Sequence, residues 1–315
     1  MERLYGLDFL RGVAALVVLV MHIAGFAGGH LAVDFFFMLS GFVMARSYEA
    51  RLRDGAISPL AFAKMRFKRL WPVMAVGAAL GLNVAIAVAG VSADLFVAFG
   101  FALLMLPGSL TVPYLLNLPA WSIFYELLAN VLHGAWFARL GNRALNIMLA
   151  LCGAAFVASF EVTGFPRILH ETDLAMQVAV VFRALVSYLI GVLMFRRFGD
   201  CAPVAVPLAA GAVLLVGYIA LVSLYPFPFW PVPFVALVAP LALMAGLDRR
   251  APPRLGHMLG EISFPLYAVH YPIITAVALA GLGAGTALVA SLSVASVWLI
   301  GSRWPDPPRP APAAA

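Results

Sequence analysis

Long apolar runs dominate this chain, and short connections rather than polar domains separate them. A helix needs about 20 predominantly apolar residues to cross a bilayer. About ten runs approach or reach that length, namely 7–27, 31–45, 71–91, 118–138, 144–160, 174–195, 204–225, 229–247, 262–281 and 284–301. The pattern therefore predicts an all-α, polytopic membrane protein with about ten transmembrane helices.

One further apolar stretch, 94–106, is too short for an ordinary span and is typical of a re-entrant or interfacial segment. The connection 46–70 carries seven lysines and arginines, which places it in the cytoplasm by the positive-inside rule. If 94–106 does not cross, the basic clusters at 139–143, 196–197 and 249–254 fall on that same side. We therefore expect a multi-pass protein with both termini in the cytoplasm.

Composition supports lipid as the main solvent, since 64% of the 315 residues are hydrophobic and only 11% are charged. The net charge of +6 is small and gathers in the connections, so we expect no nucleic-acid partner. The two cysteines form no metal-binding or disulfide pattern, and no metal site is expected. We expect one transmembrane domain over residues 1–303 and a disordered tail, rich in Pro and Ala, over residues 304–315.

The ionisable residues Arg11 and His22 stand inside the first apolar run. Ionisable groups in hydrocarbon cost about 2.5 kcal/mol or more, so they usually face the protein interior and mark functional sites. At about 100° per residue, the two side chains lie within roughly 20° of one helical face and roughly 16 Å apart along the axis. This spacing predicts a cation and an imidazole on one interior face.

Other polar residues are expected at a similar depth. Asp34 opens the second run, and the fourth run carries a polar stripe at helical spacing. That stripe consists of Ser122, Glu126, Asn130 and His133. A carboxylate beside His22 suits general-base catalysis, because it orients the ring and stabilises the imidazolium. The alternative is that these residues tie helices together by hydrogen bonds.

Two more segments carry candidate residues. Arg66 and Arg69 stand at the mouth of the third run, where arginines bind phosphates well, although such charges also set topology and contact lipid headgroups. Near the end, Ser263, Tyr267 and His270 share one helical face by their i, i+4, i+7 spacing.

In these motifs the chain resembles the membrane-bound acyltransferase 3 family, whose members O-acylate bacterial surface glycans. The resemblance covers nearly the whole chain and rests on Leu7-Asp-Phe-Leu-Arg-Gly with the Arg-x10-His spacing, on residues 33–42, 66–72 and 121–126, and on the run 262–270. It implies an acyl-CoA donor bound from the cytoplasm and a glycan acceptor at the outer face. It also implies that His22 and Arg11 form an essential pair, that Arg69 contacts donor phosphate, and that Trp121, Ser122 and Glu126 line the site.

We therefore expect an O-acyltransferase (EC 2.3.1.-) of the bacterial inner (plasma) membrane that transfers an acyl group, acetyl in particular, from acetyl-CoA to a glycan or glycolipid. No cofactor is expected to be bound permanently, and membrane lipids are the surrounding partners. His22, aided by Glu126 or Asp34, is the expected catalytic base, either in direct transfer or through an acyl-enzyme. The candidate binding residues are Arg11, Arg66, Arg69, Ser40, Trp121, Ser122, Tyr125, Tyr267 and His270, with Ser40, Ser122 and Tyr125 as candidate oxyanion donors. The competing hypothesis is a proton-coupled transporter that uses Arg11, His22 and Glu126 as a relay.

Overall fold

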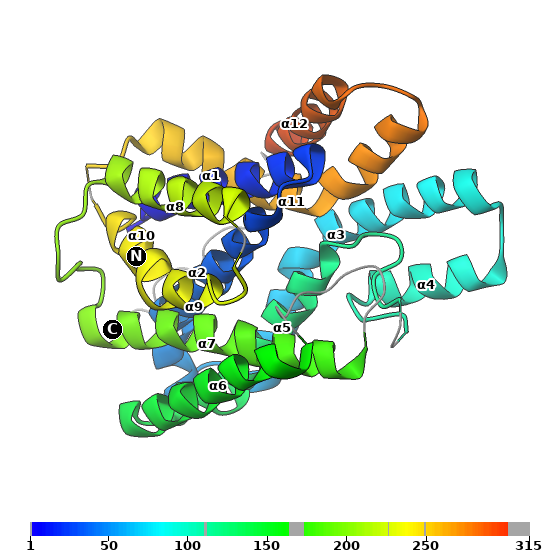
Figure 1. The fold of residues 1–315 in the computed structure, drawn as a ribbon. Coiled ribbons are helices and arrows are strands. Elements are labelled where there is room, and N and C mark those ends of the chain that lie inside the picture. Colours follow the sequence, from blue (N-terminus) through cyan, green and yellow to red (C-terminus); the bar gives the residue numbers. More distant parts are fainter. Residues whose placement is uncertain (1, 110–111, 164–172, 226, 249, 302–315) are drawn as a thin grey trace, which may run out of the picture.

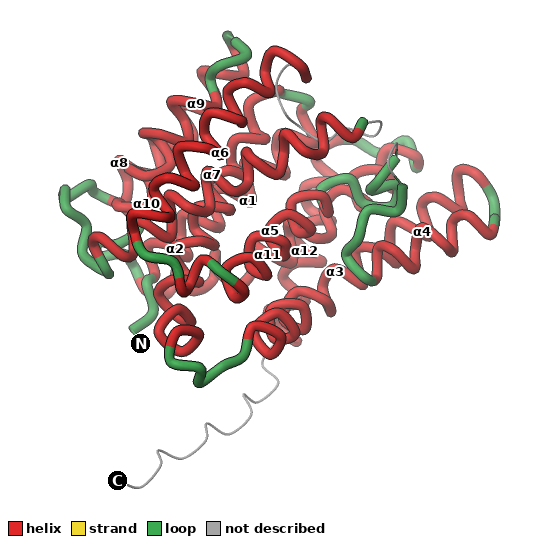
Figure 2. Tube along the Cα trace, turned by 90° about the horizontal axis from the view of Figure 1, so that it is seen from below, coloured by secondary structure: helices red, strands yellow, loops and turns green. Residues whose placement is uncertain are grey.

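The computed structural model of the chain describes residues 2–109, 112–163, 173–225, 227–248 and 250–301. The regular elements in these residues are all helices, joined by short connections (Figures 1 and 2). The α-helices are α1 (Tyr5–Ala24), α2 (Leu31–Arg53), α3 (Pro59–Ala89), α4 (Ala93–Leu103), α5 (Ala120–Ala135), α6 (Asn142–Thr163), α7 (Leu174–Phe198), α8 (Leu208–Leu224), α9 (Pro231–Pro233), α10 (Ala239–Ala245), α11 (Pro253–Leu279) and α12 (Ala284–Gly301). Three short elements complete the list: η1 (Ala27–His30), η2 (Phe137–Arg139) and the single π-helical turn η3 (Phe234–Val238).

The predicted all-α, polytopic architecture is confirmed. Within the described residues, six helical segments are long and apolar enough to cross a membrane, namely α1, Gly28–Arg53, α3, α6, α7 and α11. Shorter apolar helices account for much of the remaining predicted spans. The expected tail, 304–315, lies outside the described residues, and the division into domains stays a prediction.

The basic connection predicted at 46–70 is mostly helical. Helix α2 continues to Arg53, and α3 begins at Pro59, so the link between them is short. Ser58 caps α3 by accepting a hydrogen bond from the Ala61 amide (3.2 Å), and Pro59 has the fixed φ that suits a first helical turn. The basic residues therefore lie on extensions of two helices beyond their apolar parts. We call this side of the molecule the basic end, and it is marked by Arg46, Arg53, Arg139 and Arg196.

The short stretch predicted at 94–106 forms α4, which runs back along α3 (Figure 1). The indole of Trp71 in α3 donates a hydrogen bond to the Leu103 carbonyl (2.9 Å), which fixes the end of α4. Helix α5 is also short and follows the connection 104–119. The end of α4 lies beside Trp71, whereas Leu116, which precedes α5, lies against Gly81, so the connection turns back along α3 before α5 begins.

Helices α1 and α11 are parallel neighbours over most of their lengths. Tyr5 lies against Gly256, Asp8 against Gly260, and further along His22 meets His270. Pro272 has no amide hydrogen to give to the Ala268 carbonyl one turn earlier. That carbonyl instead accepts a hydrogen bond from the buried Asn117 side chain (2.8 Å), which ties the start of α5 to the middle of α11.

Helices α2 and α7 form the second parallel pair, and glycines let their backbones touch. A Cβ added at Gly41 would overlap the Tyr188 carbonyl, and one added at Gly191 would overlap the Met38 carbonyl. Small residues allow this close packing in membrane proteins, where van der Waals contact drives helix association. The two pairs, with α3 and α5, enclose the polar interior described next.

Candidate active site

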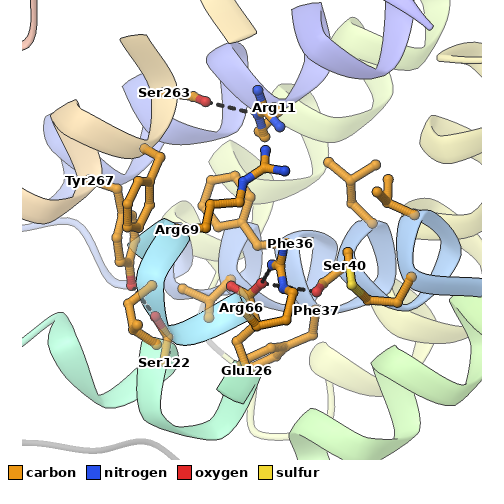
Figure 3. Close-up of a pocket in the computed structure, with 16 residues that line it drawn as sticks. Arg11, Phe36, Phe37, Ser40, Arg66, Arg69, Ser122, Glu126, Ser263 and Tyr267 are labelled. Carbon is orange, nitrogen blue, oxygen red and sulfur yellow. Dashed lines mark hydrogen bonds and ion pairs between the residues drawn. The ribbon is translucent and has the colours of Figure 1, made fainter. Parts of the chain in front are cut away.

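A cavity of about 120 Å³ opens between α1, α2, α3, α5 and α11, and it is mainly apolar with a few charged groups (Figure 3). The charged side chains that line it are three arginines, Arg11, Arg66 and Arg69, and one carboxylate, Glu126. The remaining polar lining comes from Ser40, Ser122, Ser263 and Tyr267. The cavity therefore carries an excess of positive charge in an apolar setting, where an anion would be bound strongly.

Glu126 is held on one side of the cavity by α2 and α3. Its Oε1 accepts a hydrogen bond from the Arg66 guanidinium (3.0 Å) and another from the Ser40 hydroxyl (3.0 Å). The Arg66 side chain is only 6% exposed, whereas Glu126 keeps 18% of its side-chain surface. This carboxylate neutralises one of the three cations and fixes its position.

Arg11 is held on the opposite side by α11. Its guanidinium donates to the Ser263 hydroxyl (2.9 Å) and to the Gly260 carbonyl (2.6 Å), and it pairs with Asp8 one turn earlier (3.0 Å). These contacts confirm the prediction that Arg11 faces the interior. Its direction is set by three acceptors, so it is a preorganised cation.

Arg69 differs from the other two arginines. Among the described residues, no hydrogen bond or ion pair engages its guanidinium, although it keeps accessible surface. Its side chain lies in the middle of the cavity and points toward Arg11 (Figure 3). A guanidinium offers five N–H donors in a planar fork, which suits phosphate and carboxylate groups. Arg69 is thus free to bind an anion in the cavity.

Two hydroxyl groups mark the end of the cavity away from the basic end. The Ser122 and Tyr267 hydroxyl oxygens are 2.7 Å apart, and both lie near the Pro119 carbonyl (3.2 Å each). Phe36 packs edge-on against the Tyr267 ring, with centroids 5.7 Å apart. Phe36 also packs against the cluster that contains Leu19 and Leu266. Phe36 and Tyr267 therefore form a wall at this end of the cavity.

Beyond that wall, His22 and His270 form a pair. His270 Nε2 lies 3.1 Å from His22 Nδ1, and the ring centroids are 4.9 Å apart. His270 is 1% exposed, whereas His22 is half-buried. The predicted shared face of Arg11 and His22 is confirmed, because both side chains contact α11. The sequence did not indicate that the two histidines would meet.

Asp34 lies in a separate buried ion pair. Both of its oxygens accept hydrogen bonds from the Arg183 guanidinium (2.8 and 2.7 Å), and both side chains are fully buried. Arg183 also donates to the His30 carbonyl (3.0 Å) and lies 5.8 Å from the ring centroid of Trp121. Sequence reasoning missed Arg183, although it carried the signal that singled out Arg11: a lone arginine inside an apolar run.

The predicted polar stripe of α5 does face the interior, but its members have different partners. Asn130 accepts a hydrogen bond from Tyr188 (3.2 Å), and His133 lies buried among aromatic rings. Tyr125 donates to the Gln177 carbonyl (3.1 Å). The hydroxyls of Ser40, Ser122 and Tyr125 thus each have a protein acceptor in this structure, and their expected role as oxyanion donors stays a prediction.

The structure thus separates the predicted site residues into three groups. Seven line the cavity: Arg11, Ser40, Arg66, Arg69, Ser122, Glu126 and Tyr267. His22 and His270 lie beyond the wall. In the third group, Asp34 and Trp121 lie beside Arg183, and Tyr125 packs against Trp121. The Ser122–Tyr267 contact gives a reference level in the molecule. Glu126 lies about one turn of α5 closer to the basic end, and His270 lies about one turn of α11 farther from it. Glu126 and His270 are therefore separated by roughly 10 Å along the helix axes. The expected pairing of His22 with Glu126 or Asp34 therefore does not form, and neither does a continuous Arg11–His22–Glu126 relay.

Comparison with known proteins adds independent information. A family model described as an acyltransferase domain matches residues 4–302. "Protein 2 in picA locus" from Rhizobium radiobacter is 34% identical over 181 residues, which are 50% of this chain and 95% of that protein. The "Exopolysaccharide production protein ExoZ" from Rhizobium meliloti is 28% identical over 295 residues, which are 88% of this chain and 87% of that protein. No solved structure matches the chain.

Proposed function

The chain belongs to the acyltransferase family whose model spans residues 4–302, and from this premise we propose that it transfers an acyl group from acyl-CoA to a hydroxyl of a cell-surface or exported polysaccharide. Membership of the family, together with the membrane-spanning fold, makes it a membrane acyltransferase. The similarity to an exopolysaccharide production protein supports a polysaccharide or its lipid-linked precursor as the acceptor. Acetyl-CoA is the donor we propose.

The guanidinium of Arg69, which has no hydrogen-bond or ion-pair partner in the described part of the chain, is the observation that carries the donor assignment. Acyl-CoA is polyanionic, and three arginines with a single carboxylate line a cavity adjoining the basic end. Arg11 and Arg66 already have carboxylate partners, Asp8 and Glu126, so the accessible guanidinium of Arg69 is the cation left to bind an anion. In our proposal Arg69 binds donor phosphate, Arg11 and Arg66 supply the surrounding field, and the pantetheine arm extends toward Phe36 and Tyr267.

The proposed chemistry takes place at His22. Its Nε2 accepts the proton of an acceptor hydroxyl while that oxygen attacks the acyl carbon of the thioester. The new C–O bond forms, the C–S bond breaks, and the proton passes from His22 to the departing thiolate, which leaves as CoA-SH. Because the wall of Phe36 and Tyr267 lies between the cavity and His22, the acyl end must pass these two rings before transfer.

This chemistry also defines an orientation. The basic end lies in the cytoplasm, where acyl-CoA is made, and the turn between α1 and α2 lies on the outer side. Both termini are then cytoplasmic, and the protein is a multi-pass component of the bacterial inner (plasma) membrane. The donor enters from one side, and the acceptor meets His22 from the other.

The donor assignment is tested by the kinetics of Arg69→Ala in membranes supplied with acyl-labelled acetyl-CoA and acceptor glycan. We expect KM for acetyl-CoA to rise by about tenfold or more, since a hydrogen bond to a charged group contributes about 1.5–3 kcal/mol. Lys68→Ala is the matched control, because Lys68 is the adjacent cation, is exposed and does not line the cavity. Equal KM values for the wild type and Arg69→Ala would reject the donor site.

A further inference from the structure

The two histidines beyond the wall make hydrogen bonds that assign their protons. His270 Nδ1 lies 2.8 Å from the Tyr267 carbonyl and 3.1 Å from the Leu266 carbonyl. A carbonyl oxygen only accepts hydrogen bonds, so the hydrogen of neutral His270 must be on Nδ1. His270 Nε2 then carries a lone pair, and this is the atom that faces His22.

The same reasoning applies to His22. Its Nδ1 lies 3.0 Å from the Val18 carbonyl and 3.1 Å from His270 Nε2, and both of these atoms are acceptors. His22 Nδ1 must therefore be protonated and shared between them. Its Nε2 is left with the lone pair, and no hydrogen bond within the described part of the chain engages that atom. One arrangement of protons thus satisfies every contact of the pair.

We propose that His270 is a positioning residue that, together with the Val18 carbonyl, holds His22 in the Nδ1–H tautomer, so that Nε2 is the atom that accepts the proton of the acceptor hydroxyl. The inference rests on the proposed acyl transfer for its catalytic meaning. A neutral imidazole here takes the place that a carboxylate occupies in a Ser-His-Asp triad. When His22 accepts a proton on Nε2, its Nδ1–H still donates to His270 Nε2 and to Val18, which stabilises the cation without a buried carboxylate.

The surroundings of the pair agree with this role. Of the side chains packed against His22, Tyr271 meets its ring edge-on (5.3 Å between centroids), and His270 hydrogen-bonds it alongside the Val18 backbone carbonyl. The carboxylates that sequence reasoning assigned to this role, Asp34 and Glu126, are engaged by Arg183 and Arg66. No other side chain among the described residues is hydrogen-bonded to His22, so His270 is the side chain that reinforces the tautomer favoured by the Val18 carbonyl.

The test is a ¹⁵N NMR spectrum of the full-length, histidine-labelled protein in bilayers, in which the shifts of Nδ1 and Nε2 report which nitrogen is protonated. His22 resonances are assigned by their loss in His22→Gln. We expect protonated Nδ1 and bare Nε2 in the wild type and in His270→Gln, whose amide oxygen can accept the same hydrogen bond. In His270→Leu only the Val18 carbonyl remains as an acceptor, so we expect a weaker preference and a measurable fraction of the Nε2–H tautomer. His257→Leu is the matched control, because His257 is an exposed histidine on the same helix.

Kinetics of the same variants supply the catalytic readout. We expect kcat to fall about 10²–10⁴-fold in His270→Leu with KM for acetyl-CoA unchanged, and to recover in part in His270→Gln. Protonated Nε2 on His22 in the wild type, or an unchanged tautomer in His270→Leu, would overturn the proposal. The NMR result does not depend on turnover, so the failure of acyl transfer by the wild type would refute the proposed function and leave the tautomer assignment to be judged separately.

Discussion

The buried ion pair between Asp34 and Arg183 allows a quantitative prediction. Both side chains are fully buried, and two hydrogen bonds of 2.7–2.8 Å join them. Arg183→Leu leaves the Asp34 carboxylate without its positive partner, and Asp34→Leu leaves the Arg183 guanidinium without its negative partner. Removing one partner of a buried ion pair typically costs about 3–5 kcal/mol, whereas replacing both by apolar residues is often neutral or stabilising.

We therefore expect each single variant to lose about 3 kcal/mol or more, and the double variant Asp34→Leu/Arg183→Leu to be more stable than either. Unfolding by SDS in mixed micelles, followed by far-UV circular dichroism, measures these differences. Arg197→Leu is the matched control, since Arg197 is an exposed arginine on the same helix, and its loss is expected to change stability by less than about 0.5 kcal/mol.

The reasoning would be refuted by additivity, that is, by a double variant whose loss equals the sum of the two single losses. Acyl transfer by the double variant tests whether Asp34 is needed for catalysis. Both carboxylate oxygens of Asp34 are engaged by Arg183, so we expect the double variant to keep the activity that the single variants lose with their stability. A stable but inactive double variant would return Asp34 to the list of catalytic residues.

Two further predictions concern packing. Gly191→Ala is expected to lower the apparent melting temperature by several degrees, because its Cβ would overlap the Met38 carbonyl, whereas Gly217→Ala has open space and should leave it unchanged in a thermal shift assay. Phe36→Ala is expected to open the wall beside Tyr267 and to raise the rate with longer acyl chains relative to the rate with acetyl. The rates are measured with a series of acyl-CoA donors. An unchanged dependence on chain length would show that Phe36 does not separate the cavity from His22.

The sequence was sufficient to predict features that depend on one helix at a time. Helical spacing placed Arg11 and His22 on one face, and the structure has both contacting α11. Hydropathy also singled out 94–106 as a separate short element, and it forms α4 along α3. That this element does not cross the membrane stays a prediction.

Features that depend on which helices are neighbours were not predicted. Similar expected depths in the membrane suggested that His22 would meet Glu126. In the structure α11 packs against α1 and places His270 beside His22, and a single sequence does not show which helices are neighbours. The ion pair between Arg66 and Glu126 was not expected from the sequence, and a contact of Arg66 with donor phosphate stays a prediction. The close approaches at Gly41 and Gly191 involve residues about 150 positions apart, and such pairings follow from tertiary packing rather than from local pattern.

The central claim is that His22 is the catalytic base of an acyl transfer from acyl-CoA to a glycan. The most direct measurement follows acyl-labelled acetyl-CoA in membranes that contain the wild type, His22→Ala or the control His257→Ala at equal protein levels. The account predicts label in the glycan with the wild type and with His257→Ala, and a fall of about 10²-fold or more with His22→Ala. Undiminished transfer by His22→Ala would contradict the account, and so would the absence of transfer by the wild type with its own acceptor glycan.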